Sequence, residues 1–255
     1  MKPNSDYKRL FGLIGYPLGH SFSQTFFNQK FENERIDARY INFELSDISK
    51  LKEVLAVNDN LAGFNVTIPY KELIFGYLDA IDPEAKAIGA VNVVKVFRQP
   101  DGSRSLKGYN SDSVGFGDSI RPMLSPEIHR RALVLGTGGA AKAVAYALRK
   151  LGLEVTMVSR SKTTDVVTYA ELTPEIVADH HVIVNTTPLG MYPHVDECPE
   201  IPYDALTPQH ICYDLLYNPD VTLFMRKSAE RGAQVKNGLE MLLLQAFVSW
   251  NIWNK

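Results

Sequence analysis

An apolar run near the middle of the chain ends directly in a glycine-rich turn, and this junction limits the possible folds most. The run is Arg131–Leu135, and a helical pattern follows at residues 142–151. In such a turn the first glycine permits a tight bend, the second admits a pyrophosphate, and a small third residue lets helix and strand pack. The helix start offers free N–H groups to phosphates. We therefore expect a dinucleotide site, with a plain ligand-free turn as the alternative. Its residues are Gly136, Gly138, Gly139, Ala140 and Ala141.

Short apolar runs alternate with amphipathic stretches along most of the chain. This pattern is typical of βα units and of a mainly parallel sheet covered by helices on both faces. The expected strands are residues 10–14, 38–43, 63–67, 131–135, 154–158, 181–187 and 211–216, with a short one near 235. The expected helices are residues 21–33, 47–57, 70–78, 142–151, 221–231 and a buried helix at 239–253. Residues 91–97 and 105–109 read as an antiparallel hairpin around Asp101-Gly102.

The strand after the glycine turn indicates which dinucleotide binds. An NAD site carries an acidic residue at the end of this strand, where it binds the ribose hydroxyls. This chain instead has two hydroxyls and two cations, namely Ser159, Arg160, Ser161 and Lys162. Arginine and lysine can bind the 2′-phosphate of NADP. We predict NADP over NAD, the alternative being a solvated basic turn.

Composition excludes several classes of protein. The 27 Lys and Arg residues balance 29 Asp and Glu residues, so no strong basic field exists to attract nucleic acid or an anionic membrane. No apolar run approaches the length that a bilayer requires. Cys198 and Cys212 are too few for a disulfide framework and are not spaced as a metal or redox pair. We expect a cytoplasmic protein without a metal.

Polar clusters follow several of the expected strands, where open α/β sheets bind ligands. Taken in order, these clusters resemble the shikimate dehydrogenase family. The matching motifs are S-x-S at Ser21 and Ser23, N-V-T-x-P-x-K from Asn65 to Lys71, A-V-N ending at Asn92, N-x-D at Asn110 and Asp112, G-x-G-G-A from Gly136, N-T-T-P-L-G-M from Asn185, Y-D-L-L-Y-N-P from Tyr213, and Gly238-Leu239-x-Met241-Leu242 leading to Gln245. His20, beside Ser21, lacks the third group that a nucleophile–base pair requires.

The resemblance implies reversible reduction of 3-dehydroshikimate to shikimate by NADPH, a step of aromatic amino-acid biosynthesis. It also implies an α/β fold of two domains separated by a cleft. We expect an N-terminal α/β substrate-binding domain formed by residues 1–110 and 238–255. A Rossmann-like NADP-binding domain is expected over residues 111–237.

The resemblance assigns the proton chemistry to two residues. Lys71 resembles the catalytic lysine of the family, and its ammonium group can stabilise an alkoxide and give it a proton. Asp112 matches the partner aspartate, which orients Lys71 and accepts a hydrogen bond from a substrate hydroxyl. Whether Lys71 alone or the pair transfers the proton stays open.

The remaining matches imply contacts with substrate or cofactor. Ser21 and Ser23 resemble the residues that bind the substrate carboxylate, although two serines here also fit a helix N-cap. The other implied substrate contacts are Thr67, Asn92, Tyr217 and Gln245, and the other implied cofactor contacts are Thr187, Leu215, Gly238 and Met241. The chain departs from the commonest family pattern at Ser159–Lys162 and at Glu240, and the sequence suggests no function for Glu240.

The sequence is also compatible with other functions. A quinate/shikimate dehydrogenase using NAD or NADP would share the fold, and so would a relative acting on another hydroxylated carboxylic acid. A non-catalytic metabolite sensor is the alternative outside the enzymes, although a sensor has no need of Lys71 and Asp112. We expect a small-molecule substrate, no nucleic acid or membrane partner, and either a monomer or a homodimer.

Overall fold

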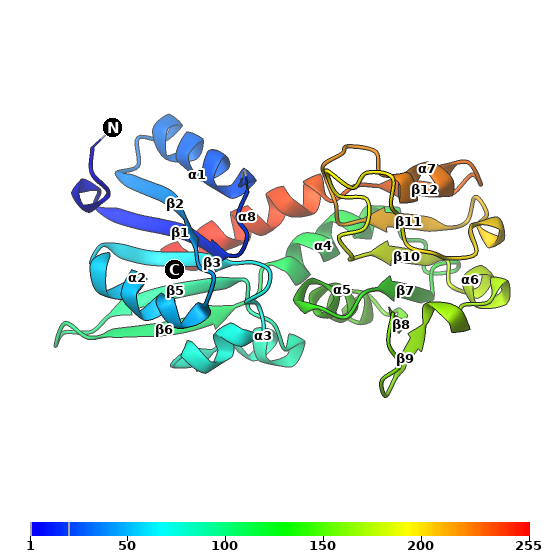
Figure 1. Cartoon of the computed structure of the whole chain (residues 1–255), viewed down its shortest axis with the longest axis horizontal. Helices are drawn as coiled ribbons and strands as arrows, with labels where there is room; N and C mark the ends of the chain where they lie inside the picture. The colour runs from blue at the N-terminus through cyan, green and yellow to red at the C-terminus, as the bar shows by residue number, and fades with distance from the viewer. Residues whose placement is uncertain (1, 20) are drawn as a thin grey trace. The chain divides into compact units, whose positions relative to one another are not determined.

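The computed structural model describes residues 2–19 and 21–255, so His20 lies outside the described residues. The chain divides into two compact units (Figure 1). The first unit comprises Met1–Ser111 and Ala246–Lys255, and the second comprises Asp112–Gln245. Each unit contains one six-stranded sheet. The last helix, α8 (Leu239–Asn254), contributes residues to both units.

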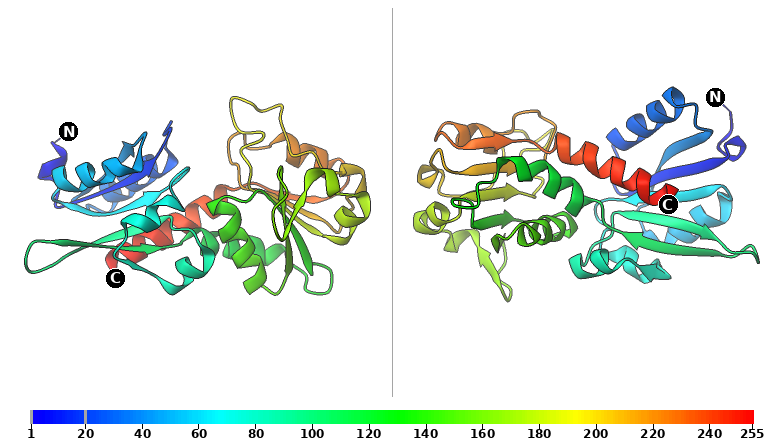
Figure 2. Two further views of the ribbon diagram at one scale, coloured as in Figure 1. Left: turned by 60° about the horizontal axis from the view of Figure 1, so that its bottom comes forward. Right: turned by 180° about the vertical axis from the view of Figure 1, so that it is seen from behind.

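The first unit has a mixed sheet with the strand order β2-β1-β3-β5-β6-β4. β1 lies parallel to β2 and β3, whereas β5 is antiparallel to both of its neighbours. The strands are β1 (Arg9–Gly15), β2 (Ala38–Glu44), β3 (Leu61–Val66), β4 (Ala80–Ile81), β5 (Val93–Arg98) and β6 (Arg104–Tyr109). The long β5–β6 hairpin is evident in Figure 2.

Helices cover both faces of this sheet. Phe27 and Phe31 of α1 (Phe22–Asn33) pack with Phe11 and with Trp253 of α8 on one face. The opposite face packs against α2 (Leu51–Val57) and α3 (Pro83–Ile88). The indole of Trp253 also donates a hydrogen bond to the carbonyl of Val94, at 3.0 Å.

The second unit has an entirely parallel sheet with the order β12-β11-β10-β7-β8-β9. Numbered along this unit alone, the strands run 3-2-1-4-5-6 from β9, which is the Rossmann order. The strands are β7 (Arg131–Leu135), β8 (Glu154–Ser159), β9 (Val166–Thr168), β10 (Val182–Asn185), β11 (Ile211–Asp214) and β12 (Gln234–Lys236). The helices are α4 (Asp112–Ile120), α5 (Gly139–Lys150), α6 (Pro174–Asp179) and α7 (Leu223–Ala229).

Alternate residues of β7 face opposite layers of helix, as the two-residue period of a strand requires. Ala132 and Val134 join a core with α4, α5 and the start of α8. Leu133 and Leu135 join a second core with α6 and α7. Short 3₁₀ turns complete the chain at Asn4–Asp6, Ile48–Lys50, Leu73–Tyr77, Arg121–Met123, Tyr169–Glu171 and Tyr203–Ala205.

These observations confirm an α/β fold with a Rossmann-like sheet and an antiparallel hairpin, but two expectations were wrong and one helix was not expected. Residues 70–78 contain only a 3₁₀ turn at Leu73–Tyr77, where Gly76 disfavours an α-helix. The terminal helix is buried along one face only, since Leu239 and Phe247 are exposed. The helix that begins at Asp112, in the polar cluster after β6, was not among the expected helices.

A chain of hydrogen bonds crosses the buried interior of the first unit. The Tyr40 hydroxyl donates to Asn65 Oδ1 at 2.8 Å, and Asn65 Nδ2 donates to Ser249 Oγ at 3.0 Å. Ser249 Oγ lies 3.1 Å from Ser111 Oγ. The four side chains are buried, so each depends on the others for the hydrogen bonds that water would otherwise supply.

None of the helices in the described part of the chain combines the length and the apolar character needed to cross a bilayer.

We predict that Ser249→Ala lowers the free energy of unfolding by about 1–3 kcal/mol, because it leaves buried polar groups of Asn65 and Ser111 short of a partner. Urea denaturation followed by circular dichroism measures this change. Asn251→Ala on the exposed side of the same helix is the control and should shift stability by less than about 0.5 kcal/mol. Equal effects of the two substitutions would contradict the importance of the network.

Candidate active site

The predicted substrate residues of the first unit lie where β1 and β3 end. Thr67 follows β3, and its N–H donates to the carbonyl of Ile14 at 2.8 Å. The carbonyl of Lys71 accepts from the N–H of Val91, also at 2.8 Å, which ties Lys71 to the segment that carries Asn92. Backbone hydrogen bonds thus hold Thr67, Lys71 and Asn92 at one edge of the sheet.

Ser21 and Ser23 differ in their local roles. Ser21 is the N-cap of α1, because its hydroxyl accepts a hydrogen bond from the N–H of Gln24 at 3.3 Å. Ser23 lies in the first turn, near the buried hydroxyl of Tyr40. Burial raises the pKa of the Tyr40 phenol well above its ordinary value, and the Ser23 hydroxyl opposes that rise. The N-cap alternative is thus confirmed for Ser21.

The side chain of Asn92 is fixed by two hydrogen bonds. Its Nδ2 donates to Ser111 Oγ at 2.9 Å, and its Oδ1 accepts from the N–H of Ser111 at 2.7 Å. Asn92 is 4% exposed, so its amide is a preorganised group rather than a mobile one. The chain next to Asp112 is fixed by the same pair of bonds.

The other predicted substrate residues belong to the second unit. Asp112 begins α4 and is 5% exposed, and Tyr217 follows β11 and is 39% exposed. Gln245 is 8% exposed, and its Nε2 donates to the carbonyl of Leu242 at 2.8 Å. Its amide therefore satisfies part of its hydrogen bonding within α8.

The glycine turn lies between β7 and α5, at the point where strand order reverses in the sheet. Gly136 has a φ of +120°, and a Cβ there would lie 2.5 Å from Thr186 Oγ1, so only glycine fits. Gly138 is the N-cap of α5 and is exposed, with open space around it. The first N–H groups of α5 lack intrahelical acceptors, and a pyrophosphate fits such a turn.

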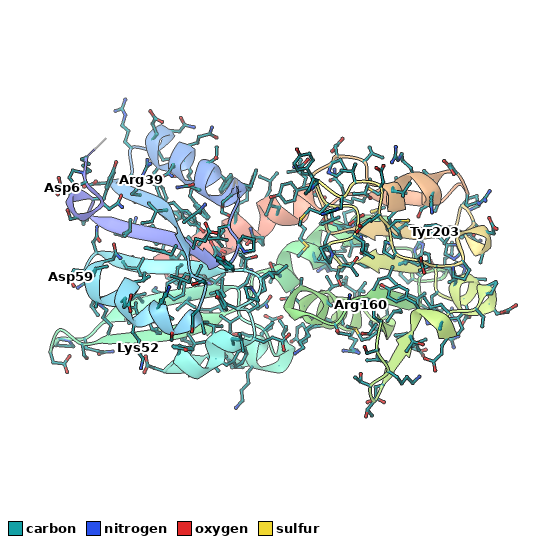
Figure 3. The ribbon with its side chains drawn as sticks, in the orientation of Figure 1. Asp6, Arg39, Lys52, Asp59, Arg160 and Tyr203 are labelled. Carbon is teal, nitrogen blue, oxygen red and sulfur yellow. The ribbon has the colours of Figure 1, made fainter. Side chains whose placement is uncertain are left out.

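The basic segment begins at Ser159, the last residue of β8, whose Oγ accepts from the N–H of Ser161 at 3.4 Å. Arg160 follows β8 and is exposed (Figure 3). Within residues 2–19 and 21–255, no carboxylate lies within ion-pair distance of Arg160. Lys162, in contrast, forms an ion pair with Glu171, with its Nζ 2.7 Å from Oε1.

A buried carboxylate organises the ends of β10 and β11. Asp214 Oδ1 accepts from Asn185 Nδ2 at 3.1 Å and from the N–H of Leu216 at 3.0 Å. Its Oδ2 accepts from Thr222 Oγ1 at 2.6 Å. Asn185 Oδ1 in turn accepts from the N–H and hydroxyl of Thr187 at 3.0 and 2.7 Å. Asp214 thus connects the two loops that carry the predicted cofactor residues Thr187 and Leu215.

Only glycine fits at position 238, because a Cβ there would collide with the Leu215 carbonyl oxygen. Met241 is 7% exposed and packs in the core with Phe116 and Tyr213. Glu240, unexplained in sequence, accepts a hydrogen bond from Ser119 Oγ at 2.9 Å. It therefore helps to anchor the first turn of α8 to α4.

Sequence reasoning missed several residues that hold the site in place. Asp214 and Asn185 stand in quoted motifs, but only the topology shows that β10 and β11 are neighbours. Tyr40, Ser249 and Glu171 lie outside those motifs, and Tyr40 carries no local signal. The sequence offered a cue at the other two: Ser249 is a polar residue within an apolar helix, and Glu171 follows Thr168 at the spacing of a capping box.

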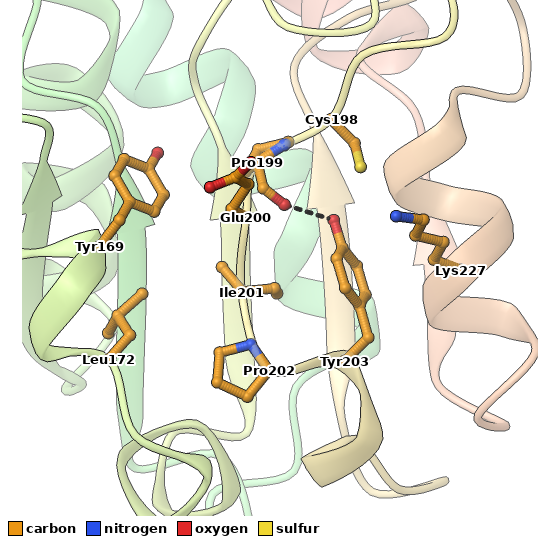
Figure 4. Close-up of a pocket in the computed structure, with 9 residues that line it drawn as sticks. All are labelled: Tyr169, Leu172, Cys198, Pro199, Glu200, Ile201, Pro202, Tyr203 and Lys227. Atoms are coloured by element: carbon orange, nitrogen blue, oxygen red, sulfur yellow. Dashed lines mark hydrogen bonds between the residues drawn. The ribbon is translucent and has the colours of Figure 1, made fainter.

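A cavity of about 400 Å³ lies elsewhere in the second unit (Figure 4). Tyr203 lines it and donates a hydrogen bond to the carbonyl of Pro199 at 2.8 Å. Cys198 and Lys227 also line this cavity, whereas none of the predicted site residues does. In the described part of the chain, no group of three or more His, Cys, Asp or Glu side chains is placed to hold a metal ion.

The buried carboxylate gives a test of this site's electrostatics. Burial raises the pKa of Asp214 to about 6, against the effect of its three hydrogen bonds. A raised pKa stabilises the fold below the unfolded value near about 4, and this stabilisation is lost as pH rises through 6. Asp214→Asn retains the shape, and its new amide can donate to Thr222.

We predict that the stability of Asp214→Asn relative to wild type is greater at pH 8 than at pH 5, by about 1.4 kcal/mol. Denaturant titrations at both pH values measure this difference. Asp196→Asn, at an exposed position, should show no such pH dependence. A difference of the opposite sign would contradict the buried, ionisable state of Asp214.

Comparison with known proteins identifies the family. Residues 13–94 match the model of the shikimate dehydrogenase substrate binding domain. The shikimate dehydrogenase (NADP(+)) of Carboxydothermus hydrogenoformans is 36% identical, and the match covers 99% of this chain and 94% of the relative.

Two solved structures support the same assignment. Shikimate dehydrogenase from Aquifex aeolicus is 37% identical with a TM-score of 0.82, covering 97% of this chain and 92% of that one. Shikimate 5-dehydrogenase from Thermus thermophilus, in complex with NADP(H) and shikimate, is 30% identical with a TM-score of 0.81, covering 96% and 93%. The chain belongs to the shikimate dehydrogenase family.

Proposed function

We propose that this protein is an NADP-dependent shikimate dehydrogenase, which interconverts 3-dehydroshikimate and shikimate. The observation that carries this proposal is the position of Lys71. It matches the catalytic lysine of the family, and the hydrogen bond from the N–H of Val91 to its carbonyl holds it near the end of β3. A purely ligand-binding protein has no need of a proton donor there. The full-length similarity to relatives named for this activity gives further support.

NADP fits the second unit on structural grounds. The φ of +120° at Gly136 and the open surface at Gly138 leave room for a pyrophosphate at the start of α5. Arg160 supplies a cation for the 2′-phosphate at the end of β8. Thr187 and Leu215 line the same edge of the sheet, on the loops that Asp214 connects.

The cofactor supplies the hydride when bound, and the chain must supply a proton to the developing alkoxide. Lys71 can stabilise that oxygen by charge and donate a proton to it. Asp112, which begins α4, would orient the ammonium group and accept a bond from a substrate hydroxyl. We expect Ser21 and Ser23 to bind the carboxylate near the start of α1, an end of the helix that favours an anion.

The other proposed substrate contacts are amide and hydroxyl groups suited to ring hydroxyls. Thr67, Asn92 and Gln245 belong to this set, and Tyr217 would reach the carboxylate. We assign residues 1–110 and 238–255 to substrate binding and residues 111–237 to cofactor binding. Cys198 and Cys212 are free, which agrees with our proposal that the enzyme acts in the cytoplasm.

Turnover with four substrate pairs tests this function. We predict rapid reduction of NADP with shikimate, followed at the absorbance band of the reduced nicotinamide, and much slower reaction with quinate or with NAD. Comparable rates with quinate or NAD would favour a quinate/shikimate dehydrogenase. No turnover with any pair would favour the sensor function and contradict our proposal.

A substitution of the proton donor tests the mechanism. Lys71→Ala should lower kcat by about 10²–10⁴-fold, the typical contribution of a positioned acid or base. Lys52→Ala, at an exposed position of α2, should leave turnover unchanged. Retention of more than a few per cent of wild-type kcat by a folded Lys71→Ala protein would remove Lys71 from this role.

A further inference from the structure

Glu171 holds one of the two cations at the expected 2′-phosphate site. Lys162 Nζ lies 2.7 Å from Glu171 Oε1 and 2.8 Å from Oε2, so both carboxylate oxygens contact the ammonium group. Ser159 pairs with Thr168 in the register of β8 and β9. Glu171, three residues after Thr168, therefore lies at the same end of the sheet as the basic segment.

The Glu171 carboxylate is itself held in place. Its Oε2 also accepts from the N–H of Thr168 at 2.8 Å, which is one of the two bonds of a capping box, and from the Thr168 hydroxyl at 3.0 Å. These bonds, with that of Lys162 the strongest, lower the pKa of Glu171 to about 2. Glu171 is therefore a fixed anion at neutral pH, next to the place where a second anion is expected.

The neighbouring Arg160 is in a different electrostatic state. In the described ranges it pairs with no carboxylate, and it lies close enough to Tyr169 to lower the pKa of that phenol against the dominant effect of burial. Arg160 can therefore engage a phosphate with its full charge, whereas the charge of Lys162 is already neutralised by Glu171.

We propose that Glu171 is a specificity-determining residue that weakens NADP binding by neutralising Lys162. The proposal rests on the NADP dependence proposed above. A phosphate near Lys162 must displace the ammonium group from Glu171 or share it with a carboxylate of like charge. NAD lacks that phosphate, so its binding does not depend on the Lys162–Glu171 ion pair. Arg160 thus raises the affinity for NADP relative to NAD, and Glu171 lowers it.

Glu171→Gln separates the charge of this residue from its capping role. Glutamine retains the capping box, since it accepts equally well from Thr168, but it no longer neutralises Lys162. We expect the Kd of NADP, measured by isothermal titration calorimetry, to fall threefold to tenfold. The Kd of NAD should change by less than twofold, and the effect on NADP should shrink at high salt.

A double-mutant cycle tests whether Glu171 acts through Lys162. In a Lys162→Met background, Glu171→Gln should change the Kd of NADP much less than in wild type. Glu175→Gln, an exposed carboxylate of α6, is the matched control and should leave both cofactors unaffected. Melting temperatures of all variants show whether the capping box survives.

An unchanged or higher Kd of NADP in a folded Glu171→Gln protein would overturn the proposal. An equal effect of Glu171→Gln with and without Lys162 would overturn the role of the ion pair. Both outcomes leave wild-type NADP binding intact. Failure of the wild type to bind NADP would instead refute the proposed cofactor, and with it this inference.

Discussion

In the first unit, the side-chain amide of Asn65 holds together the segments that meet near the carboxyl ends of β1 and β3. Asn65 is the penultimate residue of β3, two positions before Thr67, and its amide has partners on three other segments: the Tyr40 hydroxyl, the Asn92 carbonyl and the Ser249 hydroxyl. A buried amide without partners is costly. Each of these segments must therefore come to Asn65, and the segment that carries Lys71 is fixed as a result.

In the second unit, the buried carboxylate of Asp214 has the equivalent role. Asp214 accepts hydrogen bonds from Asn185 at the end of β10, from Leu216 in the turn after β11 and from Thr222 at the N-cap of α7. Burial makes its charge expensive, so the donors keep the loops in one arrangement. In both units, a buried polar group links adjoining loops through hydrogen bonds, and the proposed ligand contacts lie on those loops.

The sequence predicted best where the signal was local. The apolar strand before Gly136 and the hairpin around Asp101 depend on neighbouring residues, and both formed as expected. The helix at Asp112 was missed because Gly115 and Gly117 lower its intrinsic propensity, and only packing against α5 compensates. For α3 and α6 the signal existed, since Asp82 and Thr173 each cap a helix with proline in its first turn.

What local patterns cannot show is the partner of an exposed charge. From sequence, Arg160 and Lys162 are equivalent cations two residues apart, and nothing distinguishes their affinity for a phosphate. Because β9 pairs with β8, Glu171 lies beside Lys162 and forms an ion pair with it. Arg160 has no such carboxylate partner among the described residues. Cofactor preference in this chain thus depends on the balance between a basic turn and an acidic residue nine positions later, which a motif confined to the turn omits.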